Sequence, residues 1–144
     1  MFPVASVSIV QNGKLLMVQE CKKENYGKWN IPSGRPEPGE DIMHCAIREA
    51  QEETGYQVEL TGITGIYSFT SETKSPLVRF NFTGNIIGGD INFEQNEILD
   101  VKWFSFDQID QLKENELWNA HSIRQIVEDI KRGSSYSNDI LKSC

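Results

Sequence analysis

The stretch from Ser33 to Gly55 constrains the fold more than any other part of the sequence, because a loop that cannot be regular is followed directly by a helix. The loop, SGRPEPGE, contains two glycines and two prolines, which forbid regular structure. We expect a helix to begin at Glu40 or Asp41, since acids at this end suit the helix dipole, and to end with Gly55 as its C-terminal cap. The sequence therefore predicts a loop–helix unit in which both ends of the helix are fixed.

Three glutamates, Glu49, Glu52 and Glu53, lie near the C-terminal end of this helix. The helix dipole disfavours negative charge there by about 0.3–1 kcal/mol per acid, and like charges three or four residues apart add about a few tenths each. On a helical wheel with about 100° per residue, the acids border the apolar stripe of the helix and do not lie opposite to it. A divalent cation would turn this repulsion into attraction, so the pattern indicates a cation site at the edge of a packed surface.

The composition fits a folded domain with a negatively charged surface. The chain has 144 residues, of which 38% are hydrophobic and 24% charged, and its net charge is −7. These values favour one domain with a core and argue against a nucleic-acid polymer as partner, which would need a basic face. They permit a small phosphorylated molecule, because metal ions bridge carboxylates to phosphates.

The cysteines and the opening residues bear on cellular location. Cys21, Cys45 and Cys144 show no spacing typical of a metal site, which favours reduced thiols in the cytoplasm. The apolar opening MFPVASVSIV is too short for a membrane span and lacks the basic leader of a signal peptide. We therefore expect a cytoplasmic protein without a membrane partner.

The predicted elements follow an order typical of an α+β domain. Asn12-Gly13 is a strong hairpin signal, and the alternation of apolar and polar residues around Phe80 is typical of a strand with one buried face. We expect one domain over residues 1–133, followed by a polar C-terminal tail over residues 134–144. The predicted strands are Val4–Val10, Lys14–Val18, Trp29–Pro32, Tyr56–Ile63, Gly65–Thr70, Leu77–Ile87 and Ile98–Phe104, and the later helices are Asp107–Leu112 and Ser122–Lys131.

The charged and glycine positions from Gly34 onward have a fixed spacing. Gly34 is followed by five residues and Glu40, and then by seven residues and REAQEETGY. This pattern resembles the Nudix box, the signature of hydrolases that act on nucleoside diphosphates linked to another moiety. Tyr56 stands where an aliphatic residue is usual, and Ser33 stands where many members have glycine. The resemblance implies an α/β/α sandwich with a mixed central sheet.

The resemblance also implies a metal site that holds one to three Mg²⁺ ions, or Mn²⁺, against a diphosphate. Arg48 would orient the acids, and Glu40 would support the ligands from behind or bind an additional metal. Glu97, in a downstream loop, would be the general base or a further metal ligand, and the alternative is a solvated loop carboxylate. The direct metal ligands would be Glu49, Glu52, Glu53 and the Ser33 carbonyl.

Three basic residues are candidate partners for the phosphates of a substrate: Arg35, Lys28 and Arg79. Arg79 is the strongest candidate, because its neighbours on the predicted strand should point the other way and leave it on the open face of the sheet. The alternative is an arginine that is merely exposed on a strand. Trp29 could stack on a base, although a tryptophan in a short strand more often belongs to the core.

The expected function is metal-dependent hydrolysis of a phosphoanhydride bond in a nucleoside di- or triphosphate or a related diphosphate compound, by metal-activated water. The strand around Arg79 and the last helix are similar to a bacterial branch with broad phosphatase activity on nucleoside and thiamine-precursor phosphates. Three alternatives stay open: a pyrophosphohydrolase that removes oxidised nucleotides, a non-catalytic nucleotide sensor, and an acidic cation-buffering domain. The expected partner is a small phosphorylated molecule, and the resemblance also suggests a homodimer.

Overall fold

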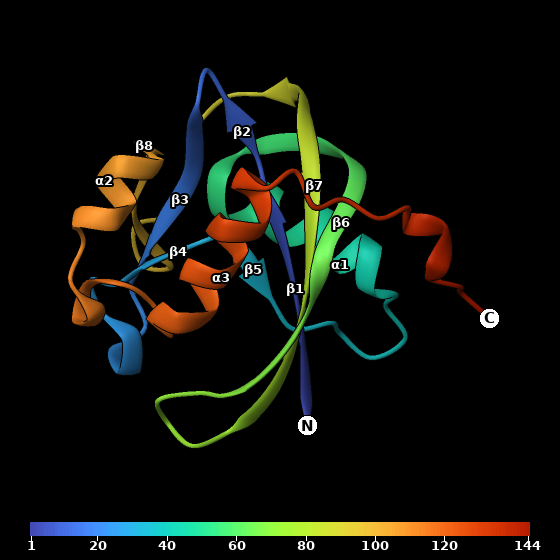
Figure 1. The fold of residues 1–144 in the computed structure, drawn as a ribbon, viewed down its shortest axis with the longest axis horizontal. Helices are drawn as coiled ribbons and strands as arrows, with labels where there is room; N and C mark the ends of the chain where they lie inside the picture. The colour runs from blue at the N-terminus through green and yellow to red at the C-terminus, as the bar shows by residue number, and fades with distance from the viewer.

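Two β-sheets and three α-helices make up the computed structural model, which describes residues 1–144 (Figure 1). The strands are β1 Phe2–Ser8, β2 Val10–Gln11, β3 Lys14–Glu20, β4 Trp29–Asn30, β5 Ser33–Gly34, β6 Tyr56–Thr70, β7 Pro76–Gly89 and β8 Ile98–Ser105. The α-helices are α1 Ile42–Thr54, α2 Phe106–Gln111 and α3 Ala120–Lys131, and the short 3₁₀ helices are η1 Lys23–Asn25, η2 Glu114–Glu116 and η3 Asn138–Ile140.

The first sheet is mixed. Its strand order is β5-β1-β7-β6, in which β1 runs parallel to β7 and antiparallel to β5, while β6 and β7 form a long antiparallel hairpin. The second sheet is antiparallel and is centred on β3, which pairs with β2, β4 and β8. A mixed sheet combined with helices confirms the predicted α+β class. The prediction that SGRPEPGE is irregular throughout is wrong at its start, because Ser33 and Gly34 form the short strand β5 against β1.

The turn between β2 and β3 has the conformation that its sequence predicts. Asn12 and Gly13 have φ angles of 52° and 74°, as a two-residue hairpin turn with a matching twist requires. The chain passes from the first sheet to the second at Ile9, so the predicted strand Val4–Val10 contributes to both sheets. The hairpin is therefore confirmed, and the long apolar run before it joins the two sheets.

The predicted interruption between Ile63 and Gly65 is wrong, because β6 is continuous from Tyr56 to Thr70. The pairing of β6 with β7 shifts register near Gly62 and Gly65, so these glycines accompany bulges instead of ending the strand. A side chain at Gly62 would come within 2.8 Å of the Ser135 Oγ. The glycine thus permits a later part of the chain to approach the strand closely.

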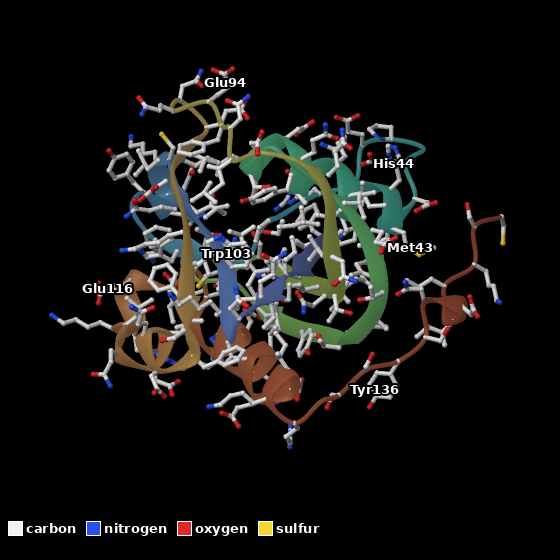
Figure 2. The ribbon with its side chains drawn as sticks, turned by 90° about the horizontal axis from the view of Figure 1, so that it is seen from above. Met43, His44, Glu94, Trp103, Glu116 and Tyr136 are labelled. Atoms are coloured by element: carbon white, nitrogen blue, oxygen red, sulfur yellow. The ribbon has the colours of Figure 1, made fainter.

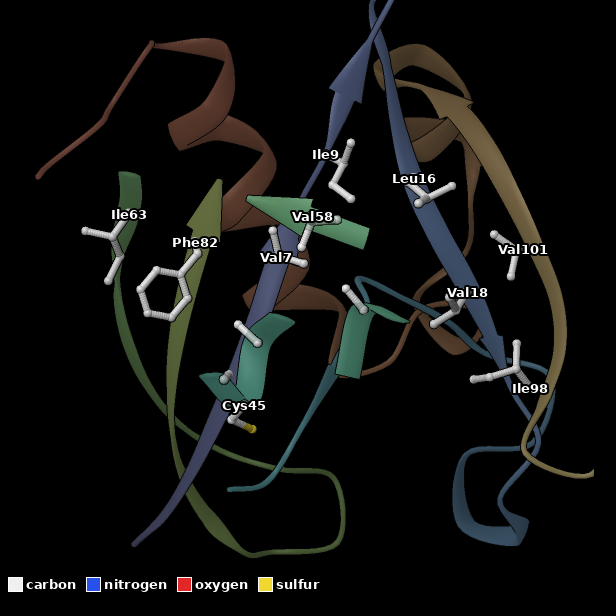
Figure 3. Packing of buried hydrophobic residues seen from close by; sticks show 13 residues of the cluster. Val7, Ile9, Leu16, Val18, Cys45, Val58, Ile63, Phe82, Ile98 and Val101 are labelled. Carbon is white, nitrogen blue, oxygen red and sulfur yellow. The ribbon is translucent and has the colours of Figure 1, made fainter. Parts of the chain in front are cut away.

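Two hydrophobic cores lie on the two faces of β3. Leu16 and Val18 face the core that α1 covers, whereas Leu15 and Met17 face the core that α3 covers. Figure 3 shows the first core, in which side chains from both sheets meet and Cys45 of α1 lies beside them. Since both faces of the sheet are buried, α1 is held firmly against the strands that carry the loops around it.

The segment after α3 returns to the first sheet. The Ile63 N–H donates to the Tyr136 carbonyl at 2.9 Å, and the Tyr136 N–H donates to the Ile63 carbonyl at 2.8 Å. Leu141 then packs against the first core, and Figure 2 shows Tyr136 on this segment as it follows one side of the molecule. Residues 134–144 thus extend the edge of the sheet at one point. None of the helices has the length and apolar character needed to span a membrane.

Candidate active site

A cleft of about 860 Å³ opens where the end of β3, the β4–β5 segment and the C-terminal half of α1 come together. Two basic side chains, Lys22 and Arg35, line the cleft together with a polar rim that includes Asn96 and Trp118. The carboxylates that line it outnumber these cations: Glu20, Glu24, Glu49, Glu52, Glu53 and Glu97. The cleft is therefore an acidic pocket that borders the helix and loop singled out by the sequence.

The ends of α1 fix how its glutamates meet the cleft. The helix begins after Asp41, whose side chain accepts from the His44 N–H at 2.9 Å, and it ends at Gly55 with φ of 87°. A Cβ at Gly55 would overlap the Asp90 carbonyl, and a Cβ at Gly34 would overlap the Glu49 carboxyl group. Glycine at both positions lets the neighbouring chain approach so closely that the acidic helix end is locked in place.

Glu53 lies deepest among the acids of α1. Its Oε1 accepts from the Ser33 N–H at 3.0 Å. Burial, reinforced by the nearby charges of Glu20 and Glu49, raises the pKa of the Glu53 carboxyl well above its usual range. Burial also raises the pKa of Glu49, although Arg48 opposes this. Glu53 forms no ion pair, whereas Glu49 pairs with Arg48 at 2.9 Å.

Arg48 lies beside the acids and binds several of them at once. It donates to both oxygens of Glu40, at 2.7 and 2.9 Å, to Glu49 at 2.9 Å and to Glu52 at 3.2 Å. The Glu40 carboxylate also accepts from the Glu37 N–H and contacts His44, and it does not line the cleft. Hydrogen bonds from Arg48 lower the pKa of Glu40 far below its usual range. Glu40 is therefore engaged behind Arg48, away from the acids that face the cleft.

The donor groups of this cleft suit a hard divalent cation. Carboxylate and carbonyl oxygens are the ligands that Mg²⁺ and Mn²⁺ prefer, and Glu49, Glu52, Glu53 and Ser33 supply them on one wall. No three acidic, histidine or cysteine side chains lie together closely enough to hold a metal ion in this conformation, and Arg48 engages Glu49 and Glu52. The residues fit such a cation if these two side chains turn from Arg48 toward it.

The structure brings together some of the predicted site residues and separates others. Arg35 and Glu97 line the cleft with the acids of α1. Lys28 lies outside the lining and forms an ion pair with Glu72 of the β6–β7 turn. Trp29 also lies outside, and its ring packs on Phe104 with centroids 4.8 Å apart. The interpretation of Trp29 as a core residue is the one that this geometry supports.

The prediction that Arg79 lies on an open sheet face is wrong. Arg79 is 0% exposed, and its guanidinium donates to the Ser6 Oγ at 2.9 Å, the Asn30 Oδ1 at 3.1 Å and the Ile31 carbonyl at 3.3 Å. The side chains do alternate along β7, but the second face is covered too, so alternation alone could not reveal the burial. Burial lowers the pKa of Arg79 to about 10, while the charges of Glu20 and Glu53 oppose the shift.

Sequence reasoning missed Glu20 and Asn30, both of which line the cleft. Glu20 is 9% exposed and Asn30 is 3% exposed. Burial raises the pKa of the Glu20 carboxyl, whereas the hydrogen bond from Asn30 lowers it. The available signal was a charged residue that ends the apolar run LLMVQE, because a buried strand rarely ends on a carboxylate without a reason.

A family model for the NUDIX domain matches residues 1–126 of the chain. The chain belongs to the Nudix family. A Caenorhabditis elegans relative named "Putative nudix hydrolase 1" is 35% identical over 119 residues, which cover 79% of this chain and 31% of the relative. A Bacillus subtilis relative named "Putative 8-oxo-dGTP diphosphatase" is 29% identical over 121 residues, which cover 84% of this chain and 75% of the relative.

A solved structure agrees with this membership over the full length of the fold. The structure is described as a NUDIX hydrolase from Nitrosomonas europaea, and it matches with a TM-score of 0.90 at 31% identity, covering 99% of this chain and 97% of that one. This Nudix chain spans about a third of the length of the C. elegans relative. In this Nudix chain the box supplies the acids of α1, while Glu20 and Asn30 come from strands that precede the box.

Proposed function

We propose that this Nudix domain hydrolyses a phosphoanhydride bond in a nucleoside di- or triphosphate, or in a related compound with a linked diphosphate, and that it needs a divalent cation to do so. One observation carries the proposal: the glutamates of α1 are grouped on the wall of a cleft of about 860 Å³ with too few cations to balance them. A cleft of this size accommodates a molecule such as a nucleotide. A divalent cation would balance the negative charges of these glutamates and those of a bound diphosphate.

The residues would divide the work according to their positions. Glu49, Glu52 and Glu53, with the Ser33 carbonyl, would hold Mg²⁺ or Mn²⁺. The cation supplies charge neutralisation at the phosphates and lowers the pKa of a bound water. Arg48 would orient the acids by its hydrogen bonds, and Glu40 would hold Arg48 from behind.

The remaining candidates concern the substrate and the proton. Arg35 faces the cleft and would bind a phosphate of the substrate. Glu97 also faces it and would be the general base or a further cation ligand. Lys28 and Trp29 do not line the cleft, and we propose that they shape its wall. Arg79 does not line the cleft either, and we propose that it supports the wall through its hydrogen bond to Asn30.

The identity of the nucleotide has two candidates. The first is a range of common nucleoside di- and triphosphates, because the strand around Arg79 and the last helix are similar to a bacterial branch with broad phosphatase activity. The second is an oxidised nucleotide, because the B. subtilis relative, which aligns with 84% of this chain, is named for 8-oxo-dGTP. For either substrate we propose a cytoplasmic protein that acts on small molecules, as a monomer or as a homodimer.

Phosphate and pyrophosphate release by the purified chain tests the proposal. We expect hydrolysis of at least one nucleotide with Mg²⁺ or Mn²⁺ and none in EDTA, across a panel of common nucleotides, 8-oxo nucleotides, nucleotide sugars and thiamine-related pyrophosphates. Glu53→Gln should remove most of the activity while the fold persists. Nucleotide binding without turnover would instead indicate a sensor, and cation binding without nucleotide binding would indicate a buffering domain.

A further inference from the structure

Asn30 is the centre of a buried hydrogen-bond network at the edge of the cleft. Its Nδ2 donates to the Glu20 Oε1 at 3.3 Å and to the Ser33 Oγ at 3.1 Å. Its Oδ1 accepts from the Arg79 Nη2 at 3.1 Å. One side chain thus connects a carboxylate of the cleft wall, the loop before α1 and an arginine that is closed off from solvent.

The chemistry of these partners allows only one orientation of the Asn30 amide. A guanidinium only donates, so the amide oxygen must face Arg79, and an ionised carboxylate only accepts, so the amide nitrogen must face Glu20. Turning the amide over would place two donors together at Arg79 and two acceptors together at Glu20. Asn30 therefore fixes the position of the Glu20 carboxylate.

Arg79 is itself held from the far side. Its Nε donates to the Ser6 Oγ at 2.9 Å, and the Ser6 hydroxyl donates to the Asn81 Oδ1 at 2.7 Å. Its guanidinium lies 5.2 Å from the centre of the Trp118 ring, and Trp118 lines the cleft. Removing an arginine from water is costly, and an apolar residue would serve the core at least as well. This burial indicates that a positive charge is needed behind Asn30 and Glu20.

Glu20 is held more rigidly than Glu97. Outside the Nudix box, the glutamates that line the cleft are Glu20, Glu97 and the exposed Glu24. The side chain of Glu97 is exposed on the loop before β8, where the structure records only its backbone N–H donating to the Glu94 carbonyl at 2.9 Å. Glu20 is buried on a strand and is held by Asn30. A group that must meet a reacting atom within a few tenths of an ångström is better placed on a rigid strand than on a loop.

We propose that Glu20 is a further catalytic carboxylate of this cleft, which takes the proton of the attacking water, and that Asn30 and Arg79 are its positioning residues. The inference rests on the proposed function. The water oxygen forms a bond to phosphorus while the bond from phosphorus to the bridging oxygen breaks. The proton passes from the water to Glu20, and the electron pair of the broken bond leaves with the departing phosphate group. Of its two proposed roles, Glu97 then retains that of a cation ligand.

The test combines steady-state kinetics with Mg²⁺ binding measured by calorimetry and with thermal unfolding. Glu20→Gln should lower kcat about 100-fold or more, while the Kd for Mg²⁺ and the Tm stay close to those of the wild type. The matched control is Glu59→Gln, which removes one charge from an exposed side chain of β6 that does not line the cleft, and it should leave kcat within about twofold of the wild type. If the wild type and both variants all fail to hydrolyse any nucleotide, the proposed function is wrong. If only the role of Glu20 is wrong, the wild type and both variants are active.

Asn30→Ala tests the positioning role on a separate residue. It should lower kcat about ten- to a hundredfold, because Glu20 then loses its fixed orientation. In a chain that already carries Glu20→Gln, the same substitution should add little, since both changes act through one carboxylate. A residue that only supports the fold would lower activity by the same factor in both backgrounds.

Three results would overturn the proposal. The first is a Glu20→Gln variant that keeps more than a third of the wild-type kcat. The second is a loss of activity matched by an equal weakening of Mg²⁺ binding, which would make Glu20 a cation ligand. The third is an Asn30→Ala variant with kcat within twofold of the wild type, and this result decides the question even where Glu20→Gln does not fold.

Discussion

At the residue scale, the buried carboxylates of the cleft destabilise the folded protein without a cation and would bind a cation when one is present. Glu53 receives one hydrogen bond from the Ser33 N–H and lies near the charges of Glu20 and Glu49. Like charges that are brought together away from water disfavour the folded state unless a cation joins them. The acids that make the cation-free protein less stable are therefore those that would bind a cation most tightly.

Replacing Glu53 by glutamine should stabilise the protein in the absence of divalent cations. The substitution keeps the shape of the side chain and removes a carboxyl whose charged form burial disfavours, so we expect the free energy of unfolding in EDTA to rise by about 1 kcal/mol, the size common for a stabilising substitution. Denaturant unfolding of both proteins in EDTA and in Mg²⁺ measures this. A variant that is less stable than the wild type in EDTA would show that the charge of Glu53 is already balanced within the protein.

The raised pKa of Glu53 also predicts how stability depends on pH. Below its ordinary pKa of 4.5, the carboxyl is protonated in both the folded and the unfolded chain. Above that value the unfolded chain releases the proton while the folded chain keeps it, so stability falls as the pH rises toward the raised pKa. Glu20 and Glu49 shift in the same direction and add to the slope.

Unfolding measured in EDTA between pH 5 and pH 8 therefore should show a decline that is smaller in Glu53→Gln. An equal slope in both proteins would mean that the titration of Glu53 contributes nothing to it.

The three acids of α1 could be predicted from the sequence, because their spacing on one helix places them together. Arg79 and Asn30 could not, because burial depends on which elements cover each strand face, and Glu20 left only the signal of a carboxylate that ends an apolar run.

At the element scale, the helix and its preceding loop work as one unit because glycines let them touch. A side chain at Gly34 would overlap the Glu49 carboxyl group, and a side chain at Gly55 would overlap the Asp90 carbonyl. The box spacing predicted the helix, its cap at Gly55 and its neighbouring loop. It could not predict that β6 continues past Gly62, because a glycine that admits a distant segment has the same sequence signal as one that ends a strand.

Gly34→Ala should separate folding from activity. The new methyl group displaces the Glu49 carboxylate, so we expect hydrolysis to fall about 10- to 100-fold while circular dichroism shows the helices intact. The matched control is Gly88→Ala on β7, where the new methyl group would meet only the end of the flexible Gln57 side chain. Equal activity in both variants would show that Glu49 tolerates displacement.

At the scale of the whole molecule, the two sheets and α1 bring together segments that are far apart in the sequence. The walls of the cleft come from β3, β4, the end of α1 and the loop before β8. The fold class and the order of most elements followed from hydrophobic patterns and turn residues. Which segments meet at the cleft did not, because strand pairing between distant segments leaves no periodic signal in one sequence.

The C-terminal segment contributes modestly to the whole, and the single-domain boundary at residue 133 stays a prediction. Removing residues 134–144 deletes the paired hydrogen bonds between Ile63 and Tyr136 and the packing of Leu141. We expect a loss of about 1–3 kcal/mol in the free energy of unfolding with hydrolysis retained, since none of these residues lines the cleft. A truncated chain that is unfolded would place the boundary of the domain beyond residue 133.

Calorimetric titration of the purified, EDTA-treated protein with Mg²⁺, with and without a nucleoside diphosphate, tests the central claim most directly. We predict cation binding by the wild type that is tighter when the diphosphate is present, and strongly weakened binding by Glu53→Gln. Wild-type protein that takes up no cation under either condition would contradict the claim that the acidic cleft is built to hold one.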